Sequence, residues 1–414
     1  MLHQVPMEFK EWLGKAIDLD ENWNMESYDC FDDPLYIEAR IGYVGPYSCP
    51  VCGKCCTRYD TRTRTWRDLN FGSARMNIIA EFPRVKCKEH GVREIVPEWA
   101  GKVSRLTARF EQVCLEYSCA MPVSLASKLL DVDDNTIWKI IKHYSDEYMR
   151  DLDLSDLKEF CIDETQCRKG HNYITVVTRP DTGRVIFATP GRDITAMCEF
   201  VTWLIHHGCD PKNITKISCD MGKNYLKGAS FFFPEADVVI DSFHVIQAAN
   251  RMVDDVRKRT GFKGKDGKKI RFKLLSNAED LTEEGHEMID PILENYGDIG
   301  AAYMVKEAMR DFYNECDIIH APVYLRLIIS SAVNTGIKAI SDFGDMLERH
   351  FDGIIAWHGS KISNGVAEGN NSVIQAMKSC ARGFTNVENM ISMIYLRSSR
   401  KATNNSVAPG HEII

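Results

Sequence analysis

The chain lacks any apolar run close to the roughly 18 residues that a membrane-spanning helix needs. Its first ten residues have neither the basic start nor the apolar stretch of a secretory signal. A surplus of positive charge is also missing, since 51 Lys and Arg face 59 Asp and Glu and the net charge is −8. We therefore expect a cytoplasmic protein with no membrane partner. The net charge by itself argues weakly against a nucleic-acid partner.

The charge is unevenly distributed, and screening beyond about 10 Å makes local charge matter more than the total. Residues 1–48 carry a net charge of −7, whereas residues 49–110 carry +7. A second basic stretch, residues 257–273, holds nine bases and one acid. Here Lys268 and Lys269 are expected to bind DNA phosphates. The alternative is a solvated, flexible loop around Gly261, Gly264 and Gly267.

The fifteen cysteines are an odd number in a long chain, which favours buried thiols or metal ligands in a reducing compartment over disulfides. Two knuckles, each with two ligand-type residues three positions apart and a glycine after them, are separated by 34 residues. Four sulfur or nitrogen ligands satisfy tetrahedral zinc, so the motifs predict one closed, structural Zn²⁺ site. The predicted ligands are Cys49, Cys52, Cys87 and His90. Cys55 or Cys56 can substitute for one of them.

Bases alternate with aromatic residues between the knuckles, which suits a small ribbon laid on a phosphate backbone. The pattern comprises Arg58, Tyr59, Arg62, Arg64, Trp66 and Arg67. Within it, Arg62 and Arg64 are the predicted DNA-binding residues.

A helix-turn-helix is predicted after the ribbon. Pro122 can begin a short helix, and Asp133 or Asp134 can cap a second one buried through Ile137. In this interpretation the second helix enters the major groove of DNA. Its DNA-facing residues are Asn135, Thr136, Trp138, Lys139 and Lys142. The alternative is a helical hairpin that binds no DNA.

Two acids follow apolar, strand-like runs: Asp163 after residues 160–162 and Asp220 after residues 217–219. The runs beyond residue 157 have the order βββαβαβα, which matches an RNase H-like sheet. In that sheet the strands of Asp163 and Asp220 are neighbours about 4.8 Å apart, so their carboxylates can share a metal ion. Asp241 ends the strand on the far side of the Asp220 strand and is therefore farther from Asp163. We expect Asp241 and His244 to support the metal ligands without binding the metal themselves.

A third acid, Glu368, lies on a helix expected from about Val366 to Ala381, after a turn and cap at residues 363–365. Residues 259–351 show no strand-like alternation and are interpreted as an all-helical insertion. On the later helix Glu368, Asn371 and Gln375 share a stripe that can face the metals. The stripe expected to face the core consists of Val366, Val373, Met377 and Ala381.

Four runs of residues resemble the ISL-three family of bacterial insertion-sequence transposases: Cys161–Thr165, Asp220–Tyr225, Pro234–Val245 and Asn364–Asn371. The resemblance covers roughly residues 47–400 and includes the order of zinc ribbon, helix-turn-helix and interrupted DDE core. It implies that Asp163, Asp220 and Glu368 are the catalytic triad. One departure is the second knuckle, Cys-x-x-His here, where the family usually has Cys-x-x-Cys.

The resemblance implies DDE transposition with two Mg²⁺ or Mn²⁺ ions at Asp163, Asp220 and Glu368. The partners would be terminal inverted repeats, target DNA and at least one further copy of the chain, and the protein would be associated with the bacterial nucleoid. One alternative is a non-catalytic DNA-binding regulator derived from a transposase. Another is an RNase H-like DNA nuclease.

The predicted fold class is a multidomain α+β protein. The predicted domains are an acidic arm (1–45), a zinc ribbon (46–95), a helix-turn-helix (96–150), the first part of the core (151–258), a helical insertion (259–351), the last part of the core (352–400) and a tail (401–414).

Overall fold

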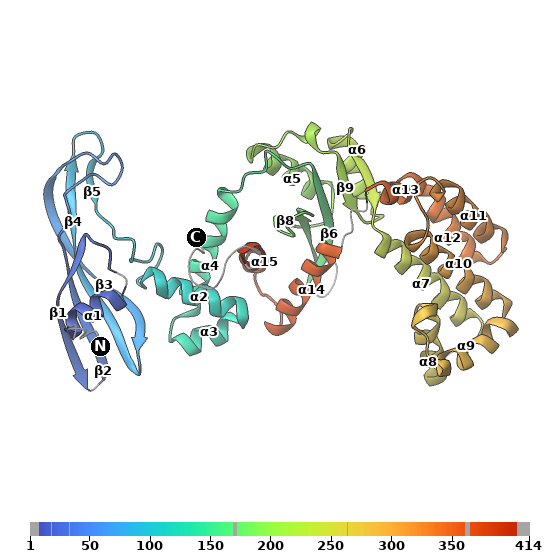
Figure 1. The fold of residues 1–414 in the computed structure, drawn as a ribbon, viewed down its shortest axis with the longest axis horizontal. Helices are drawn as coiled ribbons and strands as arrows, with labels where there is room; N and C mark the ends of the chain where they lie inside the picture. The colour runs from blue at the N-terminus through green and yellow to red at the C-terminus, as the bar shows by residue number, and fades with distance from the viewer. Residues whose placement is uncertain are drawn as a thin grey trace, which may run out of the picture. The chain divides into compact units, whose positions relative to one another are not determined.

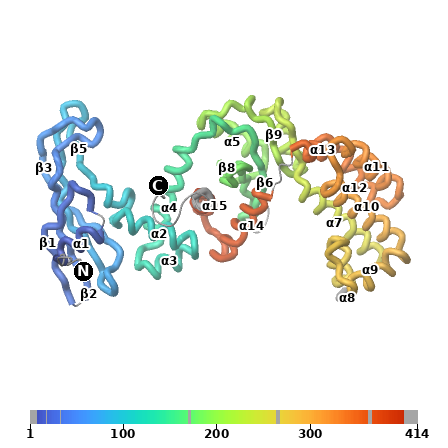
Figure 2. Tube along the Cα trace, viewed as in Figure 1, coloured from blue at the N-terminus to red at the C-terminus, as the bar shows by residue number. Residues whose placement is uncertain are grey.

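The computed structural model describes residues 8–17, 19–32, 34–168, 172–262, 264–360 and 365–403. It divides into two compact units, Met1–Glu147 and Tyr148–Ile414, which are described separately. Figure 1 and Figure 2 show the course of the chain from the strand-rich beginning to the helical end. In the described ranges no helix is both long and apolar enough to cross a membrane.

The first unit begins with helix α1 (Phe9–Ala16) and a five-stranded sheet. The strands are β1 (Trp23–Asp32), β2 (Leu35–Tyr43), β3 (Thr57–Phe71), β4 (Ala74–Cys87) and β5 (Gly91–Glu94). Their order is β1-β2-β4-β3 with β5 paired to β4, and the pair β2 and β4 is parallel. Residues 9–43 of the acidic segment thus supply a helix and a hairpin to the sheet that carries the knuckles.

Aromatic rings fill the core of this sheet. Trp66 packs on Phe82 with ring centroids 4.6 Å apart, and Trp23 and Trp99 complete the cluster. Trp66, one of the aromatic residues that alternate with bases between the knuckles, is therefore a core residue and only 3% exposed. Strand side chains alternate between the two faces, and burying so large an apolar ring is favourable.

Three helices follow, α2 (Ala108–Ala120), α3 (Val123–Leu130) and α4 (Asp134–Arg150). The predicted helix-turn-helix is confirmed in its details. Pro122 immediately precedes α3, and the Asp133 carboxylate accepts hydrogen bonds from the backbone N–H groups of Asn135 and Thr136 at 3.0 and 3.3 Å. Such a cap satisfies N–H groups that have no partner within the helix. Ile137 is fully buried, as expected.

A buried carboxylate that no sequence motif indicated joins these helices. Glu111 on α2 is fully buried and accepts hydrogen bonds from the backbone N–H groups of Lys102 and Ser104, each at 3.0 Å. It also accepts one from the Tyr144 hydroxyl on α4 at 2.9 Å. These bonds compensate the cost of burying its charge and fix the loop before α2.

The second unit contains a sheet with the order β10-β9-β6-β7-β8. The strands are β6 (Glu159–Arg168), β7 (Asn172–Thr178), β8 (Val185–Pro190), β9 (Lys216–Cys219) and β10 (Asp237–Ile240). The first three form the predicted antiparallel meander, whereas β9 and β10 run parallel to β6. Asp163 was expected at a strand end, but β6 continues to Arg168. Pairing with β7 extends through that segment, which is why the strand does not stop.

Alternation along β6 assigns its side chains to two faces. Phe160 and Ile162 join the core formed with α5 (Ile194–His206) and α6 (Lys223–Phe232). Cys161 packs against Ala367 of α14 (Gly365–Cys380) on the other face. Asp163, two residues after Cys161, therefore points to the face covered by α14. Helix α15 (Val387–Thr403) covers the edge at β8, where Ser398 Oγ accepts a hydrogen bond from Val185 N–H at 2.6 Å.

The chain leaves the sheet through α7 (Ser242–Arg259) and continues as helices with a separate core. These are α8 (Gly264–Leu275), η2 (Ala278–Asp280), α9 (Glu283–Asn295), α10 (Gly297–Asn314), α11 (Ala321–Asn334), α12 (Lys338–Arg349) and α13 (Phe351–Ser360). Helix α13 returns to β10 at Gly353, where a Cβ atom would lie 2.7 Å from the Ile240 side chain. A short 3-10 helix, η1 (Pro211–Asn213), precedes β9.

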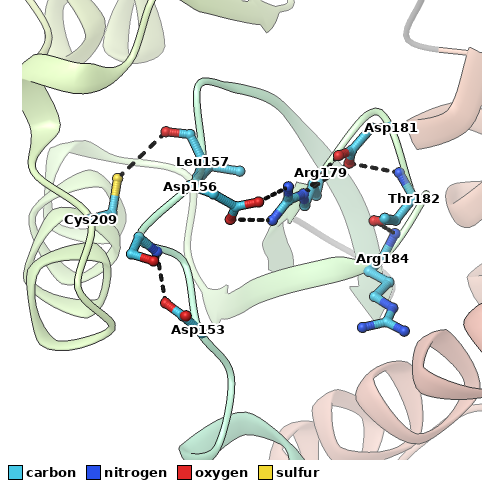
Figure 3. Close-up of polar contacts among 9 residues, drawn as sticks. Asp153, Asp156, Leu157, Arg179, Asp181, Thr182, Arg184 and Cys209 are labelled. Atoms are coloured by element: carbon cyan, nitrogen blue, oxygen red, sulfur yellow. Dashed lines mark hydrogen bonds and ion pairs between the residues drawn. The ribbon is translucent and has the colours of Figure 1, made fainter.

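An arginine fixes the turn between β7 and β8 (Figure 3). Arg179 donates two hydrogen bonds to Asp156, at 2.9 and 2.7 Å, and two more to Asp181, at 2.9 and 3.0 Å. Bidentate pairing of this kind is geometrically specific. It ties the entrance of β6 to the Pro-Asp-Thr-Gly turn at residues 180–183.

Candidate functional site

The four predicted zinc ligands form one compact cluster. The ligand atoms of Cys49, Cys52, Cys87 and His90 all lie within 4.8 Å of one another. Cys87 Sγ is 3.6 Å from His90 Nδ1, and Cys52 Sγ is 3.9 Å from Cys87 Sγ. Metal–ligand bonds of about 2.0–2.3 Å in a tetrahedron require edges of about 3.4–3.8 Å. The arrangement fits Zn²⁺, and His90 occupies the fourth position.

Backbone geometry builds both knuckles. Gly53 and Gly91 have φ values of +68° and +69°, which favour glycine, and Gly53 N–H donates to Cys49 carbonyl oxygen at 2.8 Å. The backbone N–H groups of His90 and then Glu89 lower the pKa of the Cys87 thiol to about 6. This favours the thiolate, the form that binds metal. Cys55, weighed as a substitute ligand, is exposed and does not belong to the cluster.

The residues predicted to contact DNA from α4 lie along its accessible side. Asn135, Lys139 and Lys142 are exposed, while Thr136 and Trp138 are half-buried. The opposite side, which includes the fully buried Ile140 and Ile141, packs into the unit. The helix therefore has a polar face available to a groove.

The two arginines predicted to bind DNA from β3 differ in their surroundings. Arg62 is exposed, whereas Arg64 forms an ion pair with Glu94 of β5 and lies 5.9 Å from the Phe82 ring. Arg64 is therefore partly engaged inside the first unit.

The basic stretch of residues 257–273 is not a glycine-centred loop over most of its length. It forms the end of α7 and most of α8, which contains Gly264 and Gly267. Arg257 and Arg271 form ion pairs with Asp254 at 2.8 and 3.1 Å, so part of the positive charge is neutralised. Lys268 and Lys269 are exposed on α8.

The predicted catalytic acids are positioned by β6, by the end of β9 and by α14. Asp163 Oδ2 accepts a hydrogen bond from the Asn371 amide at 2.6 Å, and Asp163 Oδ1 lies 3.9 Å from His244 Nε2. Asp220 follows β9 directly, level with Asp163 in the parallel register, and its Oδ1 accepts from Gly222 N–H at 2.8 Å. Glu368 lies in the first turn of α14.

Asp241 lies closer to this group than strand spacing alone implied. It caps α7 by accepting a hydrogen bond from Phe243 N–H, and its Oδ2 lies 3.8 Å from the same His244 nitrogen that approaches Asp163. The first residues of α7 thus place His244 between two acids.

Burial and mutual repulsion characterise the acids electrostatically. The pKa of Asp163 is raised, chiefly by burial, with Asp220 and Asp241 adding to the shift and His244 opposing it. Burial likewise raises the pKa of Glu368, followed by the negative charges of Asp241 and Asp163. Among the residues that the structure describes, only the zinc quartet gathers three or more His, Cys, Asp or Glu ligand atoms within 4.8 Å. The acid group is therefore wider and more open.

The predicted core-facing stripe of α14 is one position out of phase. The buried residues of this helix are Ala367, Asn370, Ile374 and Met377, so only Met377 was assigned correctly. Polar and charged side chains of α14 contact β6. Gln375 donates a hydrogen bond to Thr165 Oγ1 at 2.7 Å, and Lys378 donates one to the Gln166 carbonyl oxygen at 2.7 Å. The predicted turn and cap at Ser363 and Asn364 lies outside the described residues, as does residue 404 onward of the predicted tail.

Sequence reasoning missed Glu164, which follows Asp163 but points to the opposite face of the sheet. It lies 3.6 Å from Arg192, and its pKa is raised by burial and then by Asp220. The only sequence signal was the Asp163-Glu164 pair itself, in which strand alternation sends the two carboxylates in opposite directions.

Comparison with known proteins identifies the class. A family model described as transposase matches residues 160–394, more than half of the chain. A model for the zinc-finger of transposases IS204/IS1001/IS1096/IS1165 matches residues 45–90, and one for the helix-turn-helix domain of transposase family ISL3 matches residues 94–145. The chain belongs to the ISL3 family of transposases.

Two relatives are similar over most of their length. The transposase for insertion sequence element IS1557 of Mycobacterium tuberculosis is 26% identical, over 94% of this chain and 94% of its own. The transposase for insertion sequence element IS1001 of Bordetella parapertussis is 24% identical, over 82% of this chain and 86% of its own.

Proposed function

We propose that this transposase cleaves DNA at the ends of an insertion sequence and joins the freed 3′ hydroxyls to target DNA. Asp163, Asp220 and Glu368 are the proposed catalytic acids. The observation that carries the proposal is the placement of acids from three distant segments: Asp220 is level with Asp163 in the parallel register, and Glu368 follows Ala367, which packs against Cys161. Burial, and then the negative charges of neighbouring acids, raise the pKa of Asp163 and Glu368.

The core is proposed to be RNase H-like, interrupted by the helices from α8 to α12. Support comes from the strand order β10-β9-β6-β7-β8, with an antiparallel meander followed by two parallel strands. The helices separate Asp241 and α7 from α14, which carries Glu368. An insertion at this position leaves the sheet intact, because α7 and α13 both pack near β10.

The donor set suits hard divalent cations such as Mg²⁺ or Mn²⁺, which prefer carboxylate oxygens. Burial raises the pKa of Asp163 and Glu368, and the repulsion between acids that adds to this shift is relieved by a bound dication. Asp163, Asp220 and Glu368 would hold two such ions. When bound, they stabilise the attacking and leaving oxygens of an in-line displacement at phosphorus.

The chain's own groups orient these acids. The Asn371 amide fixes one oxygen of Asp163, so that the other remains directed toward His244. Gly222 N–H holds Asp220, and the first turn of the rigid α14 carries Glu368. In the proposed reaction, water attacks the phosphodiester at the element end and the P–O3′ bond breaks. The freed 3′ hydroxyl then attacks a target phosphodiester, and a target 3′ hydroxyl leaves.

The DNA-binding modules are proposed to recognise terminal inverted repeats. The exposed face of α4 would read base edges, while Arg62, Lys268 and Lys269 would bind phosphates. Joining two element ends in one complex requires at least two copies of the chain.

Glu368→Gln tests the proposal, because it preserves shape and removes a metal-binding charge. The variant should bind end DNA nearly normally and lose magnesium-dependent nicking and strand transfer. A wild-type protein that binds ends without cutting them would instead be a regulator. A protein that cuts but never joins would be a nuclease.

A further inference from the structure

A cavity of about 380 Å³ lies beside the proposed catalytic acids, between the beginning of α7 and the helices α10 and α13. Asp241 and Glu368 line one side of it. The other walls include Phe243, Arg310, Tyr313 and Trp357. The cavity therefore adjoins Glu368, one of the proposed catalytic acids.

The cavity wall contains two buried hydrogen-bond donors that no described residue satisfies. The Tyr313 side chain is 8% exposed, and its hydroxyl has no partner in the described part of the chain. The indole N–H of Trp357 is also buried without a partner there, and the two rings meet edge to face at 5.0 Å. Because Tyr313 and Trp357 both line the cavity, an acceptor group placed against them would satisfy these two donors.

The charge of the walls favours a neutral ligand. Arg310 forms ion pairs with Glu307, at 3.0 Å, and with Glu279, so its charge is compensated. Asp241 and Glu368 are acidic, so an anionic group would be repelled at this end of the cavity. A neutral, planar group with acceptors suits the donors and the aromatic walls.

One aromatic side chain of the cavity wall, Phe243, directly precedes His244. Phe243 is 47% exposed and contacts His244 edge to face at 5.7 Å. His244 in turn lies 3.9 Å from Asp163. An exposed ring of this kind offers a stacking surface for a nucleobase.

We propose that this cavity binds a nucleobase extruded from the DNA next to the cleaved phosphodiester. Phe243 stacks on the base, and Tyr313 and Trp357 donate hydrogen bonds to its ring or carbonyl acceptors. The inference rests on the proposed function, because the acids must hold a DNA end for a base to reach the cavity. Extrusion separates the base from its pair and lets the strand bend at the scissile phosphate.

The test uses the full chain bound to an element-end duplex, with Ca²⁺ in place of Mg²⁺ to prevent cleavage. Thymine is placed in turn at each position near the cleavage point, and permanganate detects a thymine that has left the stack. One position should become reactive with wild-type protein and lose that reactivity with Phe243→Ala. Tyr313→Phe, which keeps the ring, should reduce it.

Cleavage rates in Mg²⁺ provide the second measurement. Phe243→Ala should slow cleavage by about 5- to 150-fold, the effect of losing one base-stacking ring. Tyr313→Phe should slow it by about 2- to 10-fold, as for one neutral hydrogen bond. A mismatch at the reactive position should partly restore both rates, because it lowers the cost of extrusion. Phe231→Ala, which removes a 77% exposed ring on α6, is the matched control and should cleave normally.

The outcomes separate the two proposals. If wild-type protein cleaves but no thymine becomes reactive, or if Phe243→Ala cleaves like wild type, the cavity proposal is wrong and the transposase mechanism stands. If wild-type protein does not cleave end DNA in Mg²⁺, the proposed function fails and the cavity proposal fails with it.

Discussion

The zinc cluster and the acid group are both sets of metal-ligand side chains, yet they are built in opposite ways. The zinc ligands come from one segment, Cys49 to His90, and their atoms lie within 4.8 Å of one another. Backbone N–H groups lower the pKa of the Cys87 thiol to about 6. The acids come from segments as far apart as Asp163 and Glu368, and burial raises their pKa. Backbone donors thus favour the charged form of Cys87, whereas burial disfavours the charged forms of Asp163 and Glu368.

The largest expected effect comes from breaking the closed site. Cys49→Ser should reduce bound zinc from about one per chain to nearly none and unfold the ribbon, because metal binding supplies folding free energy. Metal analysis and thermal unfolding measure this. Cys55→Ser, an exposed neighbour outside the cluster, should retain zinc. A folded wild-type protein without zinc would contradict the assignment.

The open site is tested by comparing two acids that follow neighbouring strands. Asp220→Asn should reduce cleavage by roughly 1,000-fold or more, as expected for a ligand whose metal contributes several kcal/mol. Asp241→Asn should cost only about 10- to 100-fold, as for a group that supports the ligands. Rates of magnesium-dependent nicking decide between them. An inactive Asp241→Asn with an active Asp220→Asn would require the second catalytic acid to be reassigned.

The DNA-binding surfaces should respond by smaller amounts. Asn135→Ala with Lys139→Ala should lose about 1–3 kcal/mol of discrimination per lost base contact. Neutralising Lys268 and Lys269 should weaken binding to all sequences alike and flatten the salt dependence. Binding titrations on end DNA and random DNA at several salt concentrations measure both. Equal losses on the two DNAs for the first variant would refute base reading by α4.

The smallest effect concerns stability. Because the pKa of Asp163 is raised in the folded protein, its ionised form costs stability at neutral pH, and that cost disappears as the pH falls through the raised pKa. In magnesium-free buffer Asp163→Asn should therefore raise the melting temperature at pH 7, and the gain should shrink toward pH 4. The carbonyl oxygen of the new amide can still accept a hydrogen bond from Asn371. If the variant instead melts at a lower temperature than wild type at pH 7, the negative charge of Asp163 is compensated by its neighbours in the folded protein.

Local patterns were sufficient for much of the fold. The two knuckle motifs predicted the zinc cluster correctly. In each motif, two ligands three positions apart and a following glycine form a turn that needs no distant partner. Asp133 was one of two predicted caps of the second helix for the same reason, since a cap bonds only to the next few residues.

Distant packing decided the rest. The buried face of α14 was predicted wrongly because it depends on packing against β6 and β7. Asn370 donates a hydrogen bond to Thr178 and Asn371 donates one to Asp163. The periodicity of the α14 sequence does not reveal these contacts. The alternating bases and aromatic residues likewise did not reveal that Trp66 is buried, because its core partners, such as Trp99, lie on other segments.

The sequence by itself determined the zinc ligands, the helix-turn-helix and the identity of the candidate acids, because each depends on residue chemistry and short spacing. Only the tertiary structure decided that Asp163 and Glu164 face opposite sides of a sheet, that His244 lies between Asp163 and Asp241, and that Tyr313 and Trp357 line a cavity beside Glu368. Those relations require chain segments far apart in sequence to meet, and they are set by packing free energy distributed over the whole second unit.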